Sequence, residues 1–274
     1  MSTGVVALSA ARDAASYGGK AAQLSAALAA GLPVPAGFAL STQALTALVR
    51  SDSATLERVC ALAAALGPRL AARSSAVGED SQTASFAGQH LTLLNVSGPS
   101  ALVAALGQVY ASARSAAALA YRKRRGIEEQ PQMAAVVQPL VDARCAGVLF
   151  TRNPMTQADE YVIEAGWGLG ESVVAGLITP DHYRVSRQGA LLEARVGEKD
   201  LRIGCAGRGG THEVPVAPEL ALAHCLDATW LKRLTELAAQ CEAHFGAGLD
   251  LEWACTADTL HLLQVRPIST GARG

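Results

Sequence analysis

The chain has 274 residues and a mass of 28.2 kDa, enough for two domains at ~150 residues each. Half of its residues are hydrophobic, 17% are charged and only 4% are aromatic, so we expect a large aliphatic core and exclude general disorder. With a net charge of −1 and a pI near 6.6, the chain has no overall charge that would attract nucleic acid or anionic lipid. We therefore expect neither as a partner.

The six cysteines are scattered and form no C-x-x-C pair, a pattern that fits neither a structural zinc site nor a disulfide framework. A reducing compartment is expected. The N-terminus has no basic region of the signal-peptide type, and no apolar run approaches the ~20 residues that span a bilayer. These observations predict a cytoplasmic protein without a membrane partner.

Helical patterns dominate the first half of the chain. Leu24 and Leu28 among alanines predict a helix over 20–30, which Gly31 ends. The other elements expected in this half are a strand over 38–40, a helix over 42–66, an extended segment over 69–73 and a helix over 97–121.

Short strands dominate the second half. They are expected over 133–141, 146–151, 161–164, 182–187 and 191–196, followed by a helix over 218–245 and a hairpin over 249–268. The sequence therefore predicts an α+β protein with a helix-rich lobe over 1–140 and a strand-rich lobe over 141–274.

The predicted hairpin carries the most chemistry. With a turn at residues 257–259, Glu252 lies opposite Gln264, Asp250 opposite Arg266, and Trp253 opposite Leu263. This register buries Leu251 and its neighbours on one face and gathers the polar side chains on the other. Carboxylate and amide oxygens suit Mg²⁺, and arginine offers a planar fork to phosphate oxygens. The alternative is an ordinary cross-strand ion pair between Asp250 and Arg266.

Three other segments suit a nucleotide. Gly18-Gly19-Lys20 precedes a helix, whose N-terminus favours anions, although such a segment is also a plain turn and lacks the spacing of a Walker loop. Arg73-Ser74-Ser75, with the small residues 85–89 after it, could fold over phosphates or form a surface loop. Gln138-Pro139-Leu140-Val141 lies at the expected lobe boundary, where backbone groups could bind an adenine or simply end a strand.

Seven segments follow one another in a characteristic order. They are Gly18-Gly19-Lys20, Gly31-Leu32-Pro33-Val34-Pro35-Ala36-Gly37-Phe38, Arg73-Ser74-Ser75, Ser85-Phe86-Ala87-Gly88, Gly147-Val148-Leu149-Phe150-Thr151, Gly168-Leu169-Gly170-Glu171 and Gln264-Val265-Arg266-Pro267. Together they resemble the ATP-binding N-terminal domain of phosphoenolpyruvate synthase, pyruvate phosphate dikinase and rifampin phosphotransferase. The resemblance covers the chain from about Tyr17 to Ile268.

The resemblance implies an ATP-grasp fold, in which two lobes clamp ATP and Mg²⁺ bridges the phosphates. The residues that it assigns are Lys20, Arg73 and Arg266 on the phosphates, Gly88 and Thr92 in the phosphate loop, Gln138, Pro139, Leu140 and Val141 around adenine, and Glu252 and Gln264 on Mg²⁺. In that family a phosphoryl or pyrophosphoryl group passes from ATP to a histidine on a swivelling domain, which carries it to a small-molecule acceptor.

Two departures from the family stand out. The stretch between Thr42 and Arg73 is shorter than in the family, and no Thr-Ser-His-Ala signature of a phosphohistidine domain occurs in the sequence. The leading expectation is an ATP-binding phosphotransferase that needs a separate histidine-carrying partner. A non-catalytic ATP sensor and an ATP-grasp ligase that activates a carboxylate are the alternatives.

Overall fold

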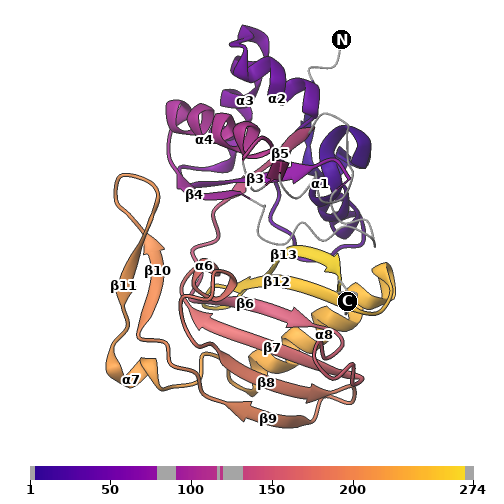
Figure 1. Cartoon of the computed structure of the whole chain (residues 1–274), viewed down its shortest axis with the longest axis vertical. Coiled ribbons are helices and arrows are strands. Elements are labelled where there is room, and N and C mark those ends of the chain that lie inside the picture. Colours follow the sequence, from indigo (N-terminus) through magenta and orange to yellow (C-terminus); the bar gives the residue numbers. More distant parts are fainter. Residues whose placement is uncertain (1–3, 79–90, 116–117, 120–131, 269–274) are drawn as a thin grey trace. The chain divides into compact units, whose positions relative to one another are not determined.

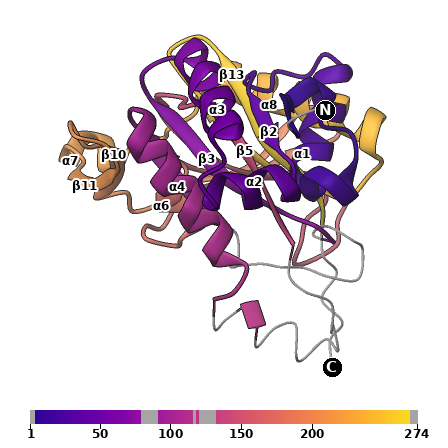
Figure 2. The same cartoon turned by 90° about the horizontal axis from the view of Figure 1, so that it is seen from above.

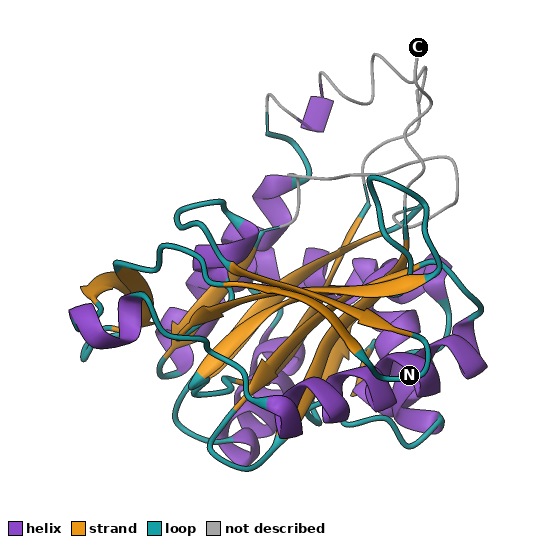
Figure 3. Ribbon diagram, turned by 90° about the horizontal axis from the view of Figure 1, so that it is seen from below, coloured by secondary structure: helices purple, strands orange, loops and turns teal. Residues whose placement is uncertain are grey.

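The computed structural model describes residues 4–78, 91–115, 118–119 and 132–268 (Figure 1). Helices and strands both contribute large parts of the chain (Figure 3), and the expected α+β class is confirmed. The chain divides into two compact units. Among the described residues, no helix combines the length and the apolar character needed to cross a bilayer.

The two units exchange short segments of chain. Unit 1 comprises residues 1–26, 36–140 and 206–210, and unit 2 comprises residues 27–35, 141–205 and 211–274. The chain therefore passes from one unit to the other between Leu140 and Val141, and again around each of the two short segments.

Unit 1 is built on a five-stranded antiparallel sheet. Its strand order is β1-β2-β5-β3-β4, with bounds Val5–Ala7 for β1, Phe38–Leu40 for β2, Met133–Pro139 for β5, Leu70–Ala76 for β3 and Thr92–Val96 for β4. A short 3₁₀ helix, η1 (Leu8–Ala10), follows β1. The long central strands β3 and β5 pair along their whole lengths, so residues of β3 hold fixed positions relative to those of β5.

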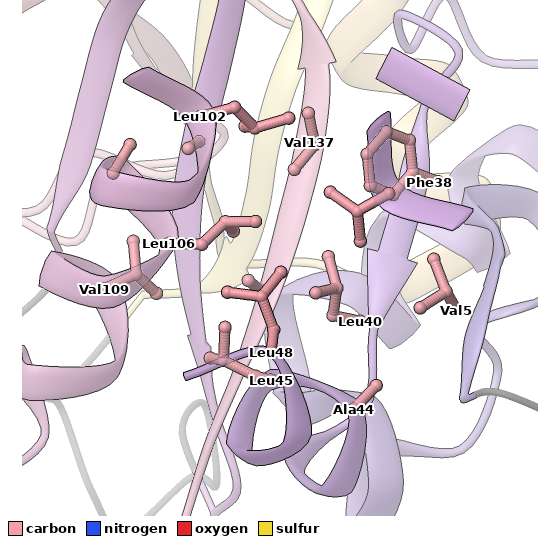
Figure 4. Close-up of a cluster of buried hydrophobic side chains, with 14 of the residues drawn as sticks. Val5, Phe38, Leu40, Ala44, Leu45, Leu48, Leu102, Leu106, Val109 and Val137 are labelled. Atoms are coloured by element: carbon pink, nitrogen blue, oxygen red, sulfur yellow. The ribbon is translucent and has the colours of Figure 1, made fainter. Parts of the chain in front are cut away.

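Helices α2 (Thr42–Val49), α3 (Ser53–Leu66) and α4 (Pro99–Ser112) pack on one face of this sheet (Figure 2). Their leucines and valines meet alternate residues of β2, β3 and β5, and together they form the aliphatic core of unit 1 (Figure 4). Alternation along β3 puts Leu70 and Ala72 into this core and turns Ala71, Arg73 and Ser75 to the opposite face.

The helix expected over 42–66 is wrong in one respect, because it is two helices. Ser51 adopts a left-handed conformation with φ of 64°, and the Asp52 side chain accepts a hydrogen bond of 2.9 Å from the Thr55 amide. An N-cap of this kind begins a new helix at Ser53. The helix expected over 97–121 is interrupted, because α4 stops at Ser112 and residues 113–115 are not helical; residues 116–117 and 120–121 lie outside the described residues.

Unit 2 contains a six-stranded antiparallel sheet with the order β13-β12-β6-β7-β8-β9. The bounds are Leu260–Pro267 for β13, Leu249–Cys255 for β12, Cys145–Phe150 for β6, Glu160–Trp167 for β7, Asp181–Ser186 for β8 and Leu191–Arg195 for β9. Helix α8 (Ala228–Phe245) packs against β12 and β13, and the short α6 (Glu171–Val174) contacts β6 and β7 (Figure 1).

Arg187, at the end of β8, anchors α8 to the sheet. It pairs with Glu242 of α8, and its guanidinium stacks 4.4 Å from the ring centre of Tyr161 in β7. Tyr161 and Leu251 share a face of the sheet with Leu149 and Ile163, and this is the face that α8 covers. The opposite face is left to the polar side chains of β12 and β13.

Two further expectations need correction. The helix expected over 218–245 is broken into α7 (Pro218–Ala221) and α8, because Asp227 caps a new helix through the Trp230 amide. A two-stranded hairpin, β10 (Leu201–Cys205) and β11 (Thr211–Pro215), was not expected at all. At the tip of this hairpin, the Ala206 and Gly210 carbonyls accept hydrogen bonds of 2.7 and 2.8 Å from the side chain of Asn95 in β4.

Candidate functional site

Helix α1 (Ala14–Ala29) has a kink at Gly18 that brings it onto strand β3. Gly18 has φ of 78° and ψ of 166°, and a Cβ placed there would lie 2.2 Å from the Ser75 carbonyl oxygen. The Ser75 hydroxyl donates to the Tyr17 carbonyl at 2.7 Å and accepts from the Ala21 amide at 3.0 Å. Glycine is therefore required at position 18, and Ser75 fixes the turn that restarts the helix.

Two buried cations lie around this turn. Lys20, which directly precedes Ala21 in α1, is 2% exposed, and Arg73, two residues before Ser75 in β3, is 6% exposed. Arg73 shares with Ser75 the face of β3 that α1 contacts, and Lys20 lies in the turn where α1 restarts, next to a helix N-terminus. Two positive charges beside a helix N-terminus form a suitable environment for phosphate oxygens.

Thr92 and Gln138 lie on strands that flank Arg73. Thr92 of β4 is directly opposite Arg73, and Gln138 of β5 is opposite Ala71. Both therefore share a face of the sheet with Arg73. The remaining residue predicted for the phosphate loop, Gly88, lies outside the described residues.

The segment predicted to bind adenine has two adjacent positions that offer it no backbone N–H donor. Pro139 has no N–H group, and the Leu140 amide donates a hydrogen bond of 2.9 Å to the Arg69 carbonyl. The Gln138 side chain is buried. The assignment of residues 138–141 as the adenine-binding segment stays a prediction. The Leu140 amide is not available for adenine, because it is hydrogen-bonded to Arg69.

In unit 2 the hairpin of β12 and β13 has the expected pairing at its polar end. Glu252 lies opposite Gln264, and Asp250 lies opposite Arg266. The register then shifts by one residue between Glu252 and Trp253. Trp253 is therefore opposite Leu262, and the expected pairing of Trp253 with Leu263 is wrong.

The shift has a simple physical reason. It lets both Leu262 and Trp253 point into the core, at 0% and 1% exposure, while Gln264 and Glu252 keep their common face. A hairpin with a constant register would place Leu262 on the polar face instead. The shift therefore preserves both the apolar core and the polar site on one pair of strands.

Arg266 and Asp250 form a close ion pair. Arg266 Nε and Nη2 both lie 2.8 Å from Asp250 Oδ2. The other oxygen, Asp250 Oδ1, is buried and has no hydrogen-bond partner among the described residues. Burial raises the pKa of the Asp250 carboxyl, Arg266 opposes this rise, and the Glu252 and Glu164 carboxylates add to it.

The polar side chains of the hairpin fit a divalent cation that takes its remaining ligands from water and a nucleotide. Among the described residues there is no group of three or more His, Cys, Asp and Glu side chains placed to hold a metal ion. Mg²⁺, however, binds proteins through one or two carboxylates and takes its remaining oxygens from water and nucleotide phosphates. Glu252, the Gln264 amide and the orphaned Asp250 Oδ1 provide oxygens of that kind on adjacent strands.

Comparison of the sequence with protein-family models identifies the family. The model described as "Pyruvate phosphate dikinase, AMP/ATP-binding domain" matches residues 53–274. The chain belongs to this family. Its membership confirms the ATP-binding family that the ordered motifs indicate.

Individual relatives agree. The chain is 40% identical over 202 residues to a rifampicin phosphotransferase of Streptomyces sviceus, which covers 73% of this chain and 23% of the relative. It is 38% identical over 208 residues to a probable phosphoenolpyruvate synthase of Methanocaldococcus jannaschii, covering 75% and 18%. A probable phosphoenolpyruvate synthase of Methanothermobacter thermautotrophicus is 35% identical over 306 residues, covering 94% and 44%. The chain thus spans less than half of these relatives.

Sequence reasoning missed the part that Ser75 plays. The sequence predicts a phosphate-covering loop or a surface loop at Arg73-Ser74-Ser75, whereas these residues lie in strand β3, from which Ser75 contacts α1. Alternation was the available signal, since Ser75 follows Arg73 by two residues in an extended segment and shares its face. The contact with Gly18, 57 residues away, had no signal in the sequence alone.

Proposed function

We propose that the chain is the ATP-binding part of a split dikinase-type phosphotransferase. In this proposal it passes a phosphoryl or pyrophosphoryl group from Mg-ATP to a histidine on a separate swivelling subunit, and AMP is released. That subunit then delivers the group to a small-molecule acceptor. Family membership, together with the opposed positions of Glu252 and Gln264 on β12 and β13, supports the proposal.

Unit 1 would bind phosphates through its buried cations. Phosphoryl transfer passes through a loose transition state with charge spread over the phosphate oxygens, so catalysis consists mainly of positioning and electrostatic stabilisation. Lys20 and Arg73 are both buried, so their side chains have little freedom to move. Ordered charges of this type lose little entropy when they stabilise a transition state.

Arg266 would act on a phosphate while Asp250 holds its orientation. Because Nε and Nη2 of Arg266 both contact Asp250 Oδ2, the guanidinium plane is fixed. Without the Asp250 carboxylate, Arg266 would keep its charge, but its guanidinium group would no longer be held in one orientation. We therefore assign Asp250 as the residue that positions Arg266.

Glu252 and Gln264 would hold Mg²⁺. When bound, Mg²⁺ neutralises charge on the phosphates and orients them. The side chains of Glu252 and Gln264 supply a carboxylate and an amide oxygen from directly opposed positions of β12 and β13, and the buried Asp250 Oδ1 has a hydrogen-bonding capacity that a cation or its water would satisfy.

Nucleotide products test this proposal. The chain is incubated with ATP and Mg²⁺, alone and together with a purified domain that carries the family's Thr-Ser-His-Ala signature, and the nucleotides are separated by chromatography. We expect AMP and phosphohistidine only in the presence of that domain. ATP binding without any product would support a sensor, and ADP formed by the chain with a carboxylate substrate would support a ligase; either result would overturn the transferase proposal.

A matched pair of variants tests the assignment of Mg²⁺. Glu252→Gln should weaken Mg²⁺-dependent ATP binding measured by calorimetry and abolish turnover, whereas Glu193→Gln on edge strand β9 should leave both unchanged. Undiminished turnover in Glu252→Gln would refute the metal assignment. An equal loss in Glu193→Gln would indicate damage to the sheet instead.

A further inference from the structure

Two cysteine thiols face each other across strands β6 and β12 in unit 2. Cys145 is the first residue of β6, Cys255 is the last residue of β12, and the two are directly opposite in the register. Their Sγ atoms are 2.8 Å apart. Both side chains are 0% exposed, and neither belongs to the polar face that carries Asp250 and Glu252.

The backbone geometry suits a disulfide. Directly opposed residues of antiparallel strands have Cα atoms about 4.5–5.5 Å apart, and disulfides bridge Cα separations of about 4.4–6.8 Å. Since an S–S bond is about 2.05 Å long, the two sulfurs need to approach by less than about 1 Å. Directly opposed positions of this kind therefore fall within the range that a disulfide bridges.

The two thiols are electronically different. The hydrogen bond with Cys145 lowers the pKa of the Cys255 thiol, and the charge of Arg144 acts in the same direction, while the same hydrogen bond raises the pKa of Cys145. Of the two thiols, Cys255 is therefore the one whose ionisation the surroundings favour. A low-pKa cysteine beside a second thiol is the arrangement found where a reactive cysteine has a resolving partner.

Cys241 provides the internal comparison. It is also 0% exposed, in α8, and burial raises the pKa of its thiol to about 12. Burial alone therefore makes a thiol in this protein inert. The opposite shift at Cys255 comes from Cys145 and Arg144.

A loop covers the pair. The Cys225 carbonyl accepts a hydrogen bond of 3.1 Å from Arg144 and lies 3.9 Å from Cys145 Sγ. The Cys225 amide is held by Asp181 Oδ2 at 2.6 Å. The segment from Ala223 to Leu226 and the ends of both strands meet here, and strand ends and loops are where local opening costs least.

We propose that Cys145 and Cys255 are a modification site, a dithiol that hydrogen peroxide converts to a disulfide. The Cys255 thiolate attacks one peroxide oxygen, the O–O bond breaks, and the departing hydroxide takes a proton to become water. The resulting sulfenic acid on Cys255 is attacked by the Cys145 sulfur, so that the S–S bond forms, the S–O bond breaks, and hydroxide leaves with the Cys145 proton as a second water. Two thiols lose two electrons, and one peroxide is reduced to two waters.

The modification reaches the strand that carries the candidate site. Cys255 is three residues after Glu252 on β12, and the cross-link would join positions 110 residues apart in sequence. A cross-link over so long a loop restricts the unfolded chain strongly. Oxidation should therefore raise the urea midpoint of unfolding.

Peptide mapping of the full chain tests the site. The protein is treated with increasing hydrogen peroxide, alkylated in denaturant and digested with trypsin, and the peptides are fragmented, because Cys241 and Cys255 share one tryptic peptide. We expect the Cys145 peptide cross-linked through Cys255 and released by dithiothreitol, with Cys241 alkylated. Recovery of Cys145 and Cys255 as alkylated thiols at peroxide levels that oxidise the half-exposed Cys60 and Cys205 would overturn the proposal.

Variants separate the site from general oxidation. In Cys145→Ser and in Cys255→Ser the cross-linked peptide and the rise in urea midpoint should both disappear, and in Cys241→Ser both should remain. If either serine variant fails to fold, the presence or absence of the cross-linked peptide in the wild-type chain still tests the proposal. A cross-link from Cys145 to Cys225 instead of Cys255 would also overturn the assignment.

Discussion

Substituting Gly18 by alanine tests the contact on which the proposed phosphate site of unit 1 depends. The new Cβ would lie 2.2 Å from the Ser75 carbonyl oxygen and 2.5 Å from its hydroxyl, so α1 has to move away from β3. The backbone at φ 78° and ψ 166° is also one that residues other than glycine rarely adopt, at a cost on the order of 1–3 kcal/mol.

The movement also breaks hydrogen bonds. Ser75 would lose its bonds to Tyr17 and Ala21, each worth roughly 0.5–1.5 kcal/mol. With the backbone strain included, we expect a loss of roughly 2–6 kcal/mol in unfolding free energy. Since Lys20 is part of the displaced turn, the Kd for ATP should rise at least about tenfold, equivalent to 1.4 kcal/mol.

Gly31→Ala is the matched control. Gly31 also has a positive φ, of 75°, but a Cβ there meets no atom within 4 Å. It should lose only about 1–2 kcal/mol from backbone strain and bind ATP normally. Urea denaturation measures the stability and titration calorimetry the affinity. Equal losses of stability in the two variants, with ATP affinity unchanged in both, would refute the close approach of α1 to β3 as a determinant of the site.

Three further predictions concern unit 2. Arg266→Lys keeps the charge but loses the two-donor contact with Asp250, so turnover should fall substantially, and a wild-type rate would mean that Arg266 is only a structural ion pair. Lys199→Met strips the fully buried Asp181 carboxylate of its cation and should cost about 3–5 kcal/mol in urea denaturation; a loss below about 1 kcal/mol would contradict this. Arg184 lowers the pKa of the Glu160 carboxyl, so ionised Glu160 stabilises the fold above its unfolded pKa, and this stabilisation is lost as the pH falls through its folded pKa. Glu160→Gln should therefore flatten the acid side of the plot of unfolding free energy against pH, and an unchanged plot would exclude this role.

The hairpin illustrates what the sequence can predict and where it stops. Alternation of polar and apolar residues was enough to pair Glu252 with Gln264 and Asp250 with Arg266. It could not reveal the one-residue shift beside Trp253, because both Leu262 and Leu263 are apolar and either could fill the core. The alternation of polar and apolar residues predicts which face of the sheet a residue prefers. Which of two adjacent leucines points into the core depends on the packing of the whole sheet.

Helix boundaries failed for a different reason. Alanine and leucine continue through 42–66 without interruption by proline or glycine, so periodicity alone favoured one helix. Asp52 and Ser53 carried a capping signal that the pattern outweighed. The hairpin of β10 and β11 shows a weaker signal. Leu201, Ile203 and Cys205 alternate with polar or small residues in β10, but β11 is largely exposed and Thr211-His212-Glu213 shows no such alternation.

The exchange of short segments between the units has a practical consequence for dissecting the protein. A fragment that ends at Leu140 lacks the Ala206 and Gly210 carbonyls, which accept both side-chain hydrogen bonds of the buried Asn95. A fragment that begins at Val141 lacks the Pro33 carbonyl, which accepts from the Leu262 amide of β13 at 2.9 Å. A cut between Leu140 and Val141 would thus remove a structural partner from each half, so the proposed phosphate and metal sites are best studied in the uncut chain.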